Sequence, residues 1–496
     1  MHSKIKSIIF LACLGGFLWA SCRDAEQRSE LLAKRYCTTC HVFPDPSLLD
    51  KKTWESGVFP EMAFRMGLDI SNLRNIDPVE HLEVLRTIPS PVLSEEEFKR
   101  IRDYYTSHAP DTLIIPGENA FSSLHQFAAE VSSLPVRHNT LLTLIKYDTD
   151  NKKIFVGTRG GKLYELTPSL ILEDSIQLTS APADIIPRKN EGPILACMGI
   201  MDPNDQAVGS IVQLSHSGTN HQTWIDSLKR PVDLQQADLN NDGKEDLVVS
   251  AFGNFTGALL AYEKIGDQYQ EHVIHNLPGT RKTVIHDFNE DGLPDILALI
   301  TQGDEHIALF TNRGKFRFSY RIVLKFSPVH GSSYFELDDF NGDGHPDILY
   351  TNGDNADYSA ILKPYHGVRI FLNDGKNQFT ESWFHPMHGA SMARAADFDN
   401  DGDLDIAAIS FFPDFKNHPE QGFIYFENTD GNFTPHTTEL ASSSRWITME
   451  TGDIDEDGDL DIILGALTFP MGVPDNVLEE WKRNPASLLV LKNKLH

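Results

Sequence analysis

The sequence predicts a multidomain chain in which a small all-α domain is followed by an all-β seven-bladed propeller. Two observations predict this order. Five similar acidic loops recur in the second half of the chain, 49 to 58 residues apart, and each has strand-like segments on both sides. Before them lies a region with helical patterns, no such loop and a C-x-x-C-H motif. Repeats of this length, each with about four short strands, are typical of propeller blades.

Residues 1–21 have the layout of a signal peptide. Lys4 and Lys6 precede an apolar run that is too short to span a bilayer, and small residues follow it before Cys22. This layout resembles a bacterial lipoprotein signal, which implies that Cys22 becomes the lipid-modified first residue of the mature chain. Because Trp19 stands where such signals normally carry leucine, secretory cleavage without lipid attachment is the alternative. Either route predicts an exported protein, in the periplasm or on the outer cell surface, and the first adds a membrane anchor.

Cys37, Cys40 and His41 form the C-x-x-C-H motif of c-type haem attachment. In that chemistry both thiols become thioethers on the haem, and the histidine binds the iron. The other three cysteines of the chain are one within the signal, Cys22 and Cys197. No disulfide framework is therefore available, and we expect Cys197 to pack as a small apolar residue.

Residues 23–110 are expected to form the haem domain. Ser94 and Glu97 predict a capping box at the start of one helix, and an earlier helix is expected from about residue 25 into Cys37. The motif and this pair of helices resemble a class I cytochrome c, which implies one covalent haem c, electron transfer and helices that pack across each other. Residues 111–122 are expected to be a linker.

The sixth ligand of the iron is expected between the two helices. Met62 and Met66 are four residues apart, so one helical face can carry both. We favour Met62, because it follows Phe59 and Pro60 and axial methionines of such cytochromes often follow a proline-bearing turn. Met66 and His81 are the alternatives. Histidine and methionine together suit electron transfer at a raised potential.

Each acidic loop has the pattern D-x-[DN]-x-D-G-x-x-D, with oxygen ligands at positions 1, 3, 5 and 9. This is the first part of an EF-hand loop without its closing glutamate or flanking helices, so up to five Ca²⁺ are expected. We expect these ions to pin strand hairpins rather than to act in catalysis. The predicted ligands are Asp238, Asn240, Asp242, Asp246, Asp287, Asn289, Asp291, Asp295, Asp339, Asn341, Asp343, Asp347, Asp397, Asp399, Asp401, Asp405, Asp453, Asp455, Asp457 and Asp461.

The loops and their flanking strands resemble the FG-GAP or VCBS repeat family from about residue 225 to the end. The resemblance implies calcium-loop propeller blades, and two weaker blades precede the five, which gives seven in residues 123–496. The last repeat ends after its third strand, and an uncovered edge strand is a liability. The segment from about 123 to 134 is therefore expected to close the last blade.

The formal net charge of −28 argues against nucleic-acid binding. Five bound Ca²⁺ would reduce that charge to about −18.

A possible ligand face lies opposite the calcium loops. Cationic or titratable residues precede the innermost strand of several blades, and the loop of blade five between its second and third strands is rich in aromatic residues. They could form a positive funnel for an anionic ligand, or they could fix loops by pairing with carboxylates. The residues concerned are Arg230, Arg281, His330, Tyr358, Lys363, Tyr365, His366, His388 and Arg445.

These features favour an exported, lipid-anchored electron-transfer protein whose propeller binds a redox partner protein or an anionic or carbohydrate ligand. Propellers of this repeat commonly bind, and no complete catalytic triad motif is recognisable in the sequence. One alternative is a propeller enzyme, an oxidoreductase or lyase acting on carbohydrate with the haem as electron acceptor. Another is an adhesion or scaffold protein.

Overall fold

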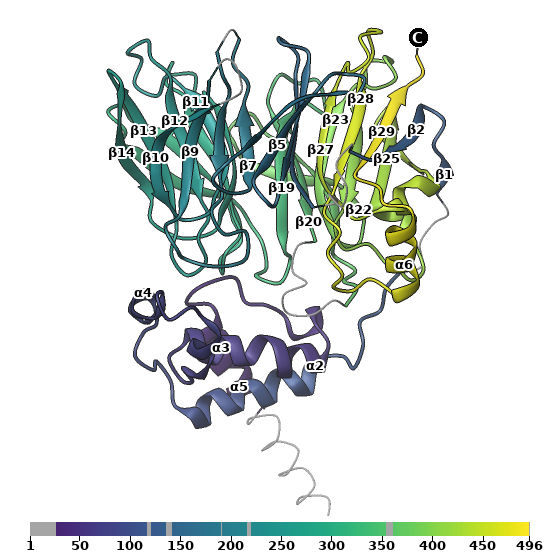
Figure 1. Cartoon of the computed structure of the whole chain (residues 1–496). Coiled ribbons are helices and arrows are strands. Elements are labelled where there is room, and N and C mark those ends of the chain that lie inside the picture. The colour runs from purple at the N-terminus through teal and green to yellow at the C-terminus, as the bar shows by residue number, and fades with distance from the viewer. Residues whose placement is uncertain are drawn as a thin grey trace, which may run out of the picture. The chain divides into compact units, whose positions relative to one another are not determined.

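A computed structural model describes residues 26–116, 121–134, 141–189, 191–215, 220–353 and 361–495. They form two compact units, which divide between Ile114 and Ile115. One unit is small and helical and the other is a β-propeller (Figure 1). The signal segment and Cys22 lie outside the described residues. Among the helices in the described ranges, none has the length and apolar character needed to cross a membrane.

The N-terminal unit is built from short helices. Its first helix covers residues 26–37. The others are η1 (Pro46–Leu48), α2 (Lys51–Thr53), η2 (Trp54–Val58), α3 (Phe59–Arg65), η3 (Ser71–Asn75), α4 (His81–Thr87) and α5 (Glu95–His108). The predicted small helical region is thus confirmed, with α5 starting at the capping box of Ser94 and Glu97.

The first helix and α5 pack against each other. Ala33 is fully buried, and the imidazole Nε2 of His108 lies 2.9 Å from the carboxylate of Glu26. Tyr105 of α5 is 1% exposed and packs against Trp54, with 4.5 Å between the ring centroids. An aromatic cluster therefore forms the core of this unit.

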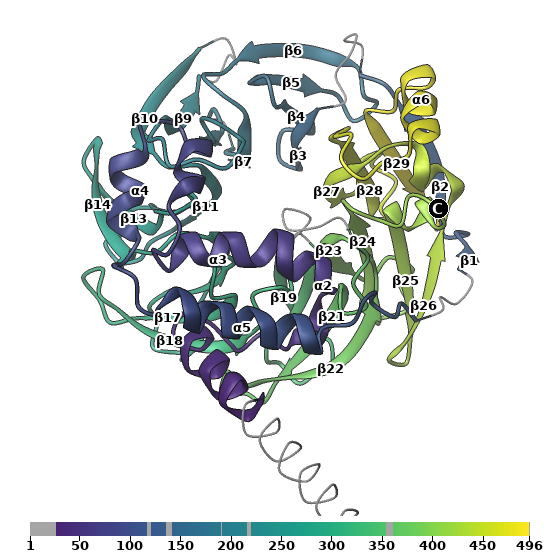
Figure 2. The same ribbon diagram turned by 90° about the horizontal axis from the view of Figure 1, so that it is seen from below.

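The second unit confirms the predicted seven-bladed propeller. Seven sheets, each with four antiparallel strands and one of them with a fifth strand added at its outer edge, stand around a common axis, as the end-on view shows (Figure 2). Blade one consists of β3 (Leu142–Asp148), β4 (Lys153–Thr158), β5 (Lys162–Leu166) and β6 (Leu172–Gln177). Blade two consists of β7 (Pro182–Ile186), β8 (Ile194–Cys197), β9 (Gly209–Leu214) and β10 (His221–Leu228). Blade three consists of β11 (Pro231–Ala237), β12 (Asp246–Ala251), β13 (Ala258–Ile265) and β14 (Gln268–His275).

The later blades follow the same order from the axis outward. Blade four consists of β15 (Thr280–His286), β16 (Asp295–Ile300), β17 (His306–Asn312) and β18 (Phe318–Lys325). Blade five consists of β19 (Ser332–Asp338), β20 (Asp347–Asn352), β21 (Gly367–Asn373) and β22 (Phe379–Pro386). Blade six has β23 (Ala390–Ala396), β24 (Asp405–Ser410), β25 (Phe423–Thr429) and β26 (Asn432–Thr437), and blade seven begins with β27 (Trp446–Gly452), β28 (Asp461–Ala466) and β29 (Leu488–Asn493). The short elements η4 (Pro419–Gly422), η5 (Glu439–Ser443) and α6 (Asp475–Arg483) lie in the connections of blades six and seven.

The ring is closed by a strand from the beginning of the propeller. In the structure β2 (Phe127–Ser132) is the fourth strand of blade seven and pairs antiparallel with β29 over six residues. Before it, β1 (Ser122–Ser123) pairs in parallel with β26 of blade six. The edge that the last repeat leaves open is thereby covered.

Polar contacts between innermost strands link every neighbouring pair of blades. The second strands of blades three to seven are fully buried and, after an initial aspartate, mostly apolar, as in β16. Each contact joins one pair of neighbouring blades. In order around the ring, from blades one and two to blades seven and one, the contacts are Thr143 Oγ1 donating to Pro182 O (2.7 Å), Leu234 N to Asp184 (2.9 Å), Lys282 to Asp233 (2.7 Å), Arg281 Nε to Ser333 O (2.6 Å), Arg394 to Glu336 (3.2 Å), Arg394 to Glu450 (3.5 Å) and Lys146 to Glu450 (2.6 Å).

Candidate functional site

The five acidic loops join the innermost strand of blades three to seven to the second strand. In blade four, Asp287 accepts hydrogen bonds from the backbone N–H of Asp291 (3.2 Å) and of Gly292 (2.7 Å). Asn289 accepts another from the same Asp291 N–H (2.9 Å). The loops of blades three, five and six repeat this pattern. Side chains of positions 1 and 3 are thus drawn over the turn of their own loop.

Two positions of each loop have a positive φ. Gly292, at position 6, has φ +83°, and glycine tolerates that conformation because it has no Cβ. Position 4 is also left-handed in all five loops, although it is glycine in only one: Asn241, Glu290, Gly342, Asn400 and Glu456. Sequence reasoning had identified the glycine but had missed the bend at position 4.

The aspartate at position 9 has a role beyond that of a predicted ligand. In blade four, Asp295 is fully buried, and its two oxygens accept from the N–H of Phe288 (3.2 Å) and of Asn312 (2.7 Å). Burial raises the pKa of this carboxyl. The equivalent Asp246, Asp347, Asp405 and Asp461 make the same two kinds of bond. The ninth aspartate therefore ties the loop to the end of the third strand.

An asparagine at the end of the third strand completes this connection in blades four to seven. The amide Nδ2 of Asn312 donates to Pro294 O (3.0 Å) in its own loop and to Leu239 O (2.8 Å) in the loop of blade three. Asn493 likewise joins blade seven to Phe398 O of blade six at 2.7 Å. Asn373 and Asn428 donate within their own blades. Sequence reasoning missed these residues, although an asparagine at the end of each of these third strands was visible in the repeats.

The donor atoms in these loops suit a hard divalent cation. Ligand atoms of Asp397, Asp399 and Asp405 lie within 4.8 Å of one another, and so do ligand atoms of Asp453, Asp455 and Asp457. Asp453 Oδ1 is buried and lacks a hydrogen-bond partner among the described residues. Carboxylate and amide oxygens are the ligands that Ca²⁺ prefers in proteins.

Blade one keeps only part of such a loop. Asp148 accepts from the N–H of Asn151 at 3.0 Å and from its amide at 2.8 Å, so the turn is held by hydrogen bonds within the protein. Lys189 lies 3.4 Å from the carboxylate of Asp150, and Lys152 pairs with Glu456 of blade seven. Ammonium groups therefore accompany the remaining carboxylates of this blade.

In the N-terminal unit, Cys37 ends the first helix and Cys40 lies in the turn that follows. Neither cysteine is in a disulfide, and Cys40 is exposed. Burial raises the pKa of the Cys37 thiol, and the nearby Tyr105 hydroxyl, which donates to Pro44 O at 2.8 Å, partly offsets this rise. His41 Nδ1 lies 2.8 Å from Val42 O. Two free thiols one turn apart and an adjacent imidazole are the donors that c-type haem attachment requires.

Met62 lies on α3 and Met66 caps its C-terminus, and both are half-buried. With Phe59 they share the i, i+3, i+7 spacing of one helical face. Phe59 packs against Tyr105 at 5.6 Å between centroids, so that face begins next to a residue that lies near Cys37. His81 is the other alternative ligand, and its Nε2 already lies within hydrogen-bonding distance of a main-chain oxygen, 3.0 Å from Ile76 O. The donor set of the unit thus fits a haem.

The arginines predicted to line a ligand face contact main-chain carbonyls in the structure. Arg230 donates to Gly253 O (2.7 Å) and Met201 O (3.0 Å), while Arg281 is one of the links between inner strands. Arg445 is only 1% exposed. These contacts resemble the loop-fixing alternative, with main-chain carbonyl oxygens among the partners.

Arg445 holds the long connection of blade seven in place. Its guanidinium donates to Phe469 O (2.6 Å) and Met471 O (2.7 Å) and lies over the rings of Phe411, Phe412 and Phe415 at 4.8 to 5.0 Å. Burial lowers the pKa of this group to about 9.

The remaining predicted residues come together between blades four and six, and we call His330, Lys363, Tyr365, His366 and His388 the mouth cluster. Its rings and charges are close enough to interact. The ring of His330 stacks on that of Tyr365 at 5.1 Å between centroids. Burial, followed by the charges of Lys363, His388, His330 and Arg369, lowers the pKa of His366 well below its ordinary value. Tyr358 lies outside the described residues.

Arg369 belongs to the same region but was not predicted. It is 7% exposed, pairs with Glu381 at 3.1 Å, donates to Tyr365 O at 2.9 Å and lies over the ring of Phe384. Burial, followed by the charge of Arg369, lowers the pKa of His330 to about 4. The mouth cluster therefore contains neutral imidazoles beside buried cationic side chains.

Comparison with known proteins supports the repeats. Residues 287–350 and 351–408 match the model of the FG-GAP-like repeat. A search of curated proteins found no match.

Three solved structures resemble the chain at low identity. The N-terminal domain of Nup159 matches at 10% identity and a TM-score of 0.43, over 76% of this chain and 98% of that one. The Pan2 WD40 domain of Neurospora crassa matches at 13% and 0.44, over 75% and 96%, and the Dos1 propeller at 8% and 0.43, over 72% and 80%. The chain thus carries FG-GAP-like repeats on a seven-bladed β-propeller, which is consistent with a binding or scaffold role.

Proposed function

We propose that this chain is an exported c-type haem protein for electron transfer, in which a calcium-stabilised propeller binds a partner protein or a ligand. The observation that carries the haem half of the proposal is the turn of Cys37, Cys40 and His41 at the end of a helix that packs on α5. The export half rests on the N-terminal sequence.

Cys37 and Cys40 would hold the haem through thioethers, and His41 and Met62 would bind its iron. The haem would supply one-electron transfer at a raised potential. Tyr105 would position this site, because it packs against Phe59 of the helix that carries Met62 and lies near the Cys37 thiol.

The test is covalent haem retention after export from a host that matures c-type cytochromes. We expect the purified chain to keep its haem stain through denaturing electrophoresis, since thioethers survive unfolding. Replacing both Cys37 and Cys40 by serine should abolish the stain, whereas Cys197→Ser, at a buried cysteine of blade two, should keep it. A wild-type chain without stain would refute the haem half.

The propeller half of the proposal is that the five loops bind Ca²⁺ and that the mouth cluster receives an anionic group of a ligand or partner. Lys363 is 2% exposed and lies with the three histidines beside Arg369, which concentrates groups that an anion can engage. If the propeller delivers a redox partner, a co-purified dehydrogenase should reduce the haem, and His366→Gln with His388→Gln should slow that reduction without lowering the melting temperature. Unchanged reduction in this double variant would exclude the mouth cluster.

A further inference from the structure

The largest departure from the repeat lies in blade two, where the connection between the first and second strands has no acidic loop. Residues 187–193 take its place, with Arg188, Lys189 and Glu191 where other blades have aspartates. Gly192 lies against the third strand, since a Cβ there would come within 1.9 Å of Leu214 O. The Leu214 N–H at the end of the third strand donates to Pro193 O at 3.0 Å. In this blade a main-chain carbonyl therefore accepts the hydrogen bond that the aspartate at position 9 of the loop accepts in blades three to seven. The connection thus folds back onto its own blade.

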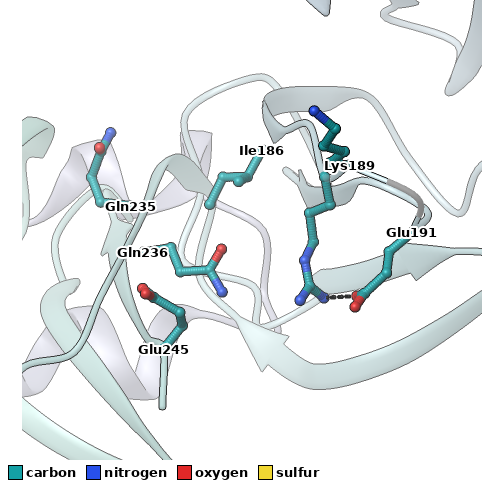
Figure 3. A pocket seen from close by; sticks show the side chains of 7 residues that line it. Ile186, Lys189, Glu191, Gln235, Gln236 and Glu245 are labelled. Atoms are coloured by element: carbon teal, nitrogen blue, oxygen red, sulfur yellow. Dashed lines mark ion pairs between the residues drawn. The ribbon is translucent and has the colours of Figure 1, made fainter. Parts of the chain in front are cut away.

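An open surface cavity of about 560 Å³ lies between this connection and blade three (Figure 3). This volume is in the range of small-molecule sites. Its walls come from β7, the connection after it, the end of β11 and the loop of blade three. The lining residues are Ile186, Arg188, Lys189, Glu191, Gln235, Gln236 and Glu245.

The formal charges of this lining cancel. Arg188 pairs with Glu191 at 2.6 Å, and Lys189 lies 3.4 Å from Asp150 of blade one. An anionic ligand would have to compete with Glu191 or Asp150 for these cations, and a cationic ligand would meet Arg188 and Lys189 beside the two carboxylates, so the lining as a whole attracts neither charge. A ligand without net charge meets neither penalty.

The polar groups of the lining offer donors and acceptors in alternation. Gln236 presents an amide with both functions, the guanidinium of Arg188 only donates, and the carboxylate of Glu245 only accepts, whereas the amide of Gln235 donates to Asp233 at 3.4 Å. Planar groups of this kind can engage two adjacent hydroxyls at once. Ile186 provides the one apolar side chain of the lining. This combination suits a ligand with many hydroxyls and a small C–H face.

We propose that this cavity, the blade-two pocket, binds a neutral polyhydroxylated ligand of the saccharide class. This inference rests on the ligand-binding part of the proposed function but places the ligand in the blade-two pocket and not at the mouth cluster. It does not depend on the haem.

The test is binding of the full chain, with Ca²⁺ present, to an array of neutral and acidic oligosaccharides, followed by titration of the best neutral binder. We expect Gln236→Ala and Glu245→Gln each to weaken binding about tenfold or more, because each removes hydrogen bonds inside the cavity. Gln270→Ala, at an exposed glutamine on the outer strand of the same blade, is the matched control and should bind as wild type does.

Other outcomes would overturn the proposal. Binding of acidic sugars alone would exclude the neutral class. No binding by wild type, or binding that survives both pocket variants at unchanged melting temperature, would exclude the pocket. The serine variants of Cys37 and Cys40 should bind sugar as wild type does, so a missing haem and an empty pocket are told apart.

Discussion

Replacing Asn312 by alanine should destabilise the propeller by about 3 kcal/mol, on the estimate of about 1 kcal/mol for each neutral hydrogen bond lost. The side chain is fully buried and makes three such bonds. Its Nδ2 donates to Leu239 O and Pro294 O, and its Oδ1 accepts from Gly314 N at 2.9 Å. Two of the bonds lie within blade four and one reaches blade three, so both the hairpin and the contact between blades should weaken.

The assay is equilibrium unfolding in urea, with the midpoint compared at constant slope. Asn432→Ala is the control, because Asn432 is exposed and its amide donates only to Thr429 O within a turn. We expect that control to change stability by less than about 0.5 kcal/mol.

Alanine also leaves a cavity, so Asn312→Asp separates the two effects. This variant keeps the shape and the acceptor for Gly314 but loses both donors and buries a charge. We expect it to be at least as unstable as the alanine variant. An aspartate variant as stable as wild type would refute the role that we assign to the amide donors.

Further predictions concern the metal, the haem and pH. Chelation should lower the melting temperature, since an ion that binds only the folded state adds about 2.7 kcal/mol at a hundredfold excess over its dissociation constant; Asp287→Ala should reduce this calcium-dependent gain, whereas Asp148→Ala in blade one should not, and a melting curve indifferent to chelator would contradict the assignment. Met62→Ala should lower the haem potential or open the iron to added ligands, while Met66→Ala should leave both unchanged, and the reverse result would move the ligand to Met66. Because the pKa of His330 is lowered to about 4 when folded, the unfolded chain binds an extra proton below its ordinary pKa of about 6.5, so stability should fall by about 2 kcal/mol from pH 7 to pH 5. His330→Gln should remove that share of the pH dependence in urea unfolding, and equal slopes for both proteins would count against it; the groups that face His330 are Tyr365, Phe326 and Arg369, with the rest of the mouth cluster beyond them.

The loops and the number of blades could be predicted because their signals are local. In the loops of blades three to six the side chains at positions 1 and 3 bond to N–H groups at most five residues away, so D-x-[DN]-x-D-G contains the whole turn. The bonds between blades have no such signal. Asn312 and Leu239 are 73 residues apart, and only the ring brings them together.

The cationic residues of the predicted ligand face show a second limit. Sequence reasoning placed Arg230, Arg281 and Arg445 at equivalent positions, but a sequence does not show main-chain acceptors. In the structure main-chain carbonyls accept from all three guanidinium groups, in connections for Arg230 and Arg445 and in the innermost strand of blade five for Arg281. The blade-two pocket was not predicted either, because no sequence motif marks it. It lies where the connection from Pro187 to Pro193 stands in place of an acidic loop.

The strand that completes blade seven also sets how the propeller responds to mechanical force. Phe127 pairs with Asn493 and Ser132 with Leu488, so the linker and the C-terminal end of β29 leave the sheet at the same end of this pair. A pull between these two ends opens the ring one hydrogen bond after another, as a zipper opens. Force applied between the linker and a ligand held in another blade instead acts along β2, so that all the hydrogen bonds of β2 are strained at once, in shear. We therefore expect the ring to resist tension between the linker and a bound ligand far better than tension between its own two ends.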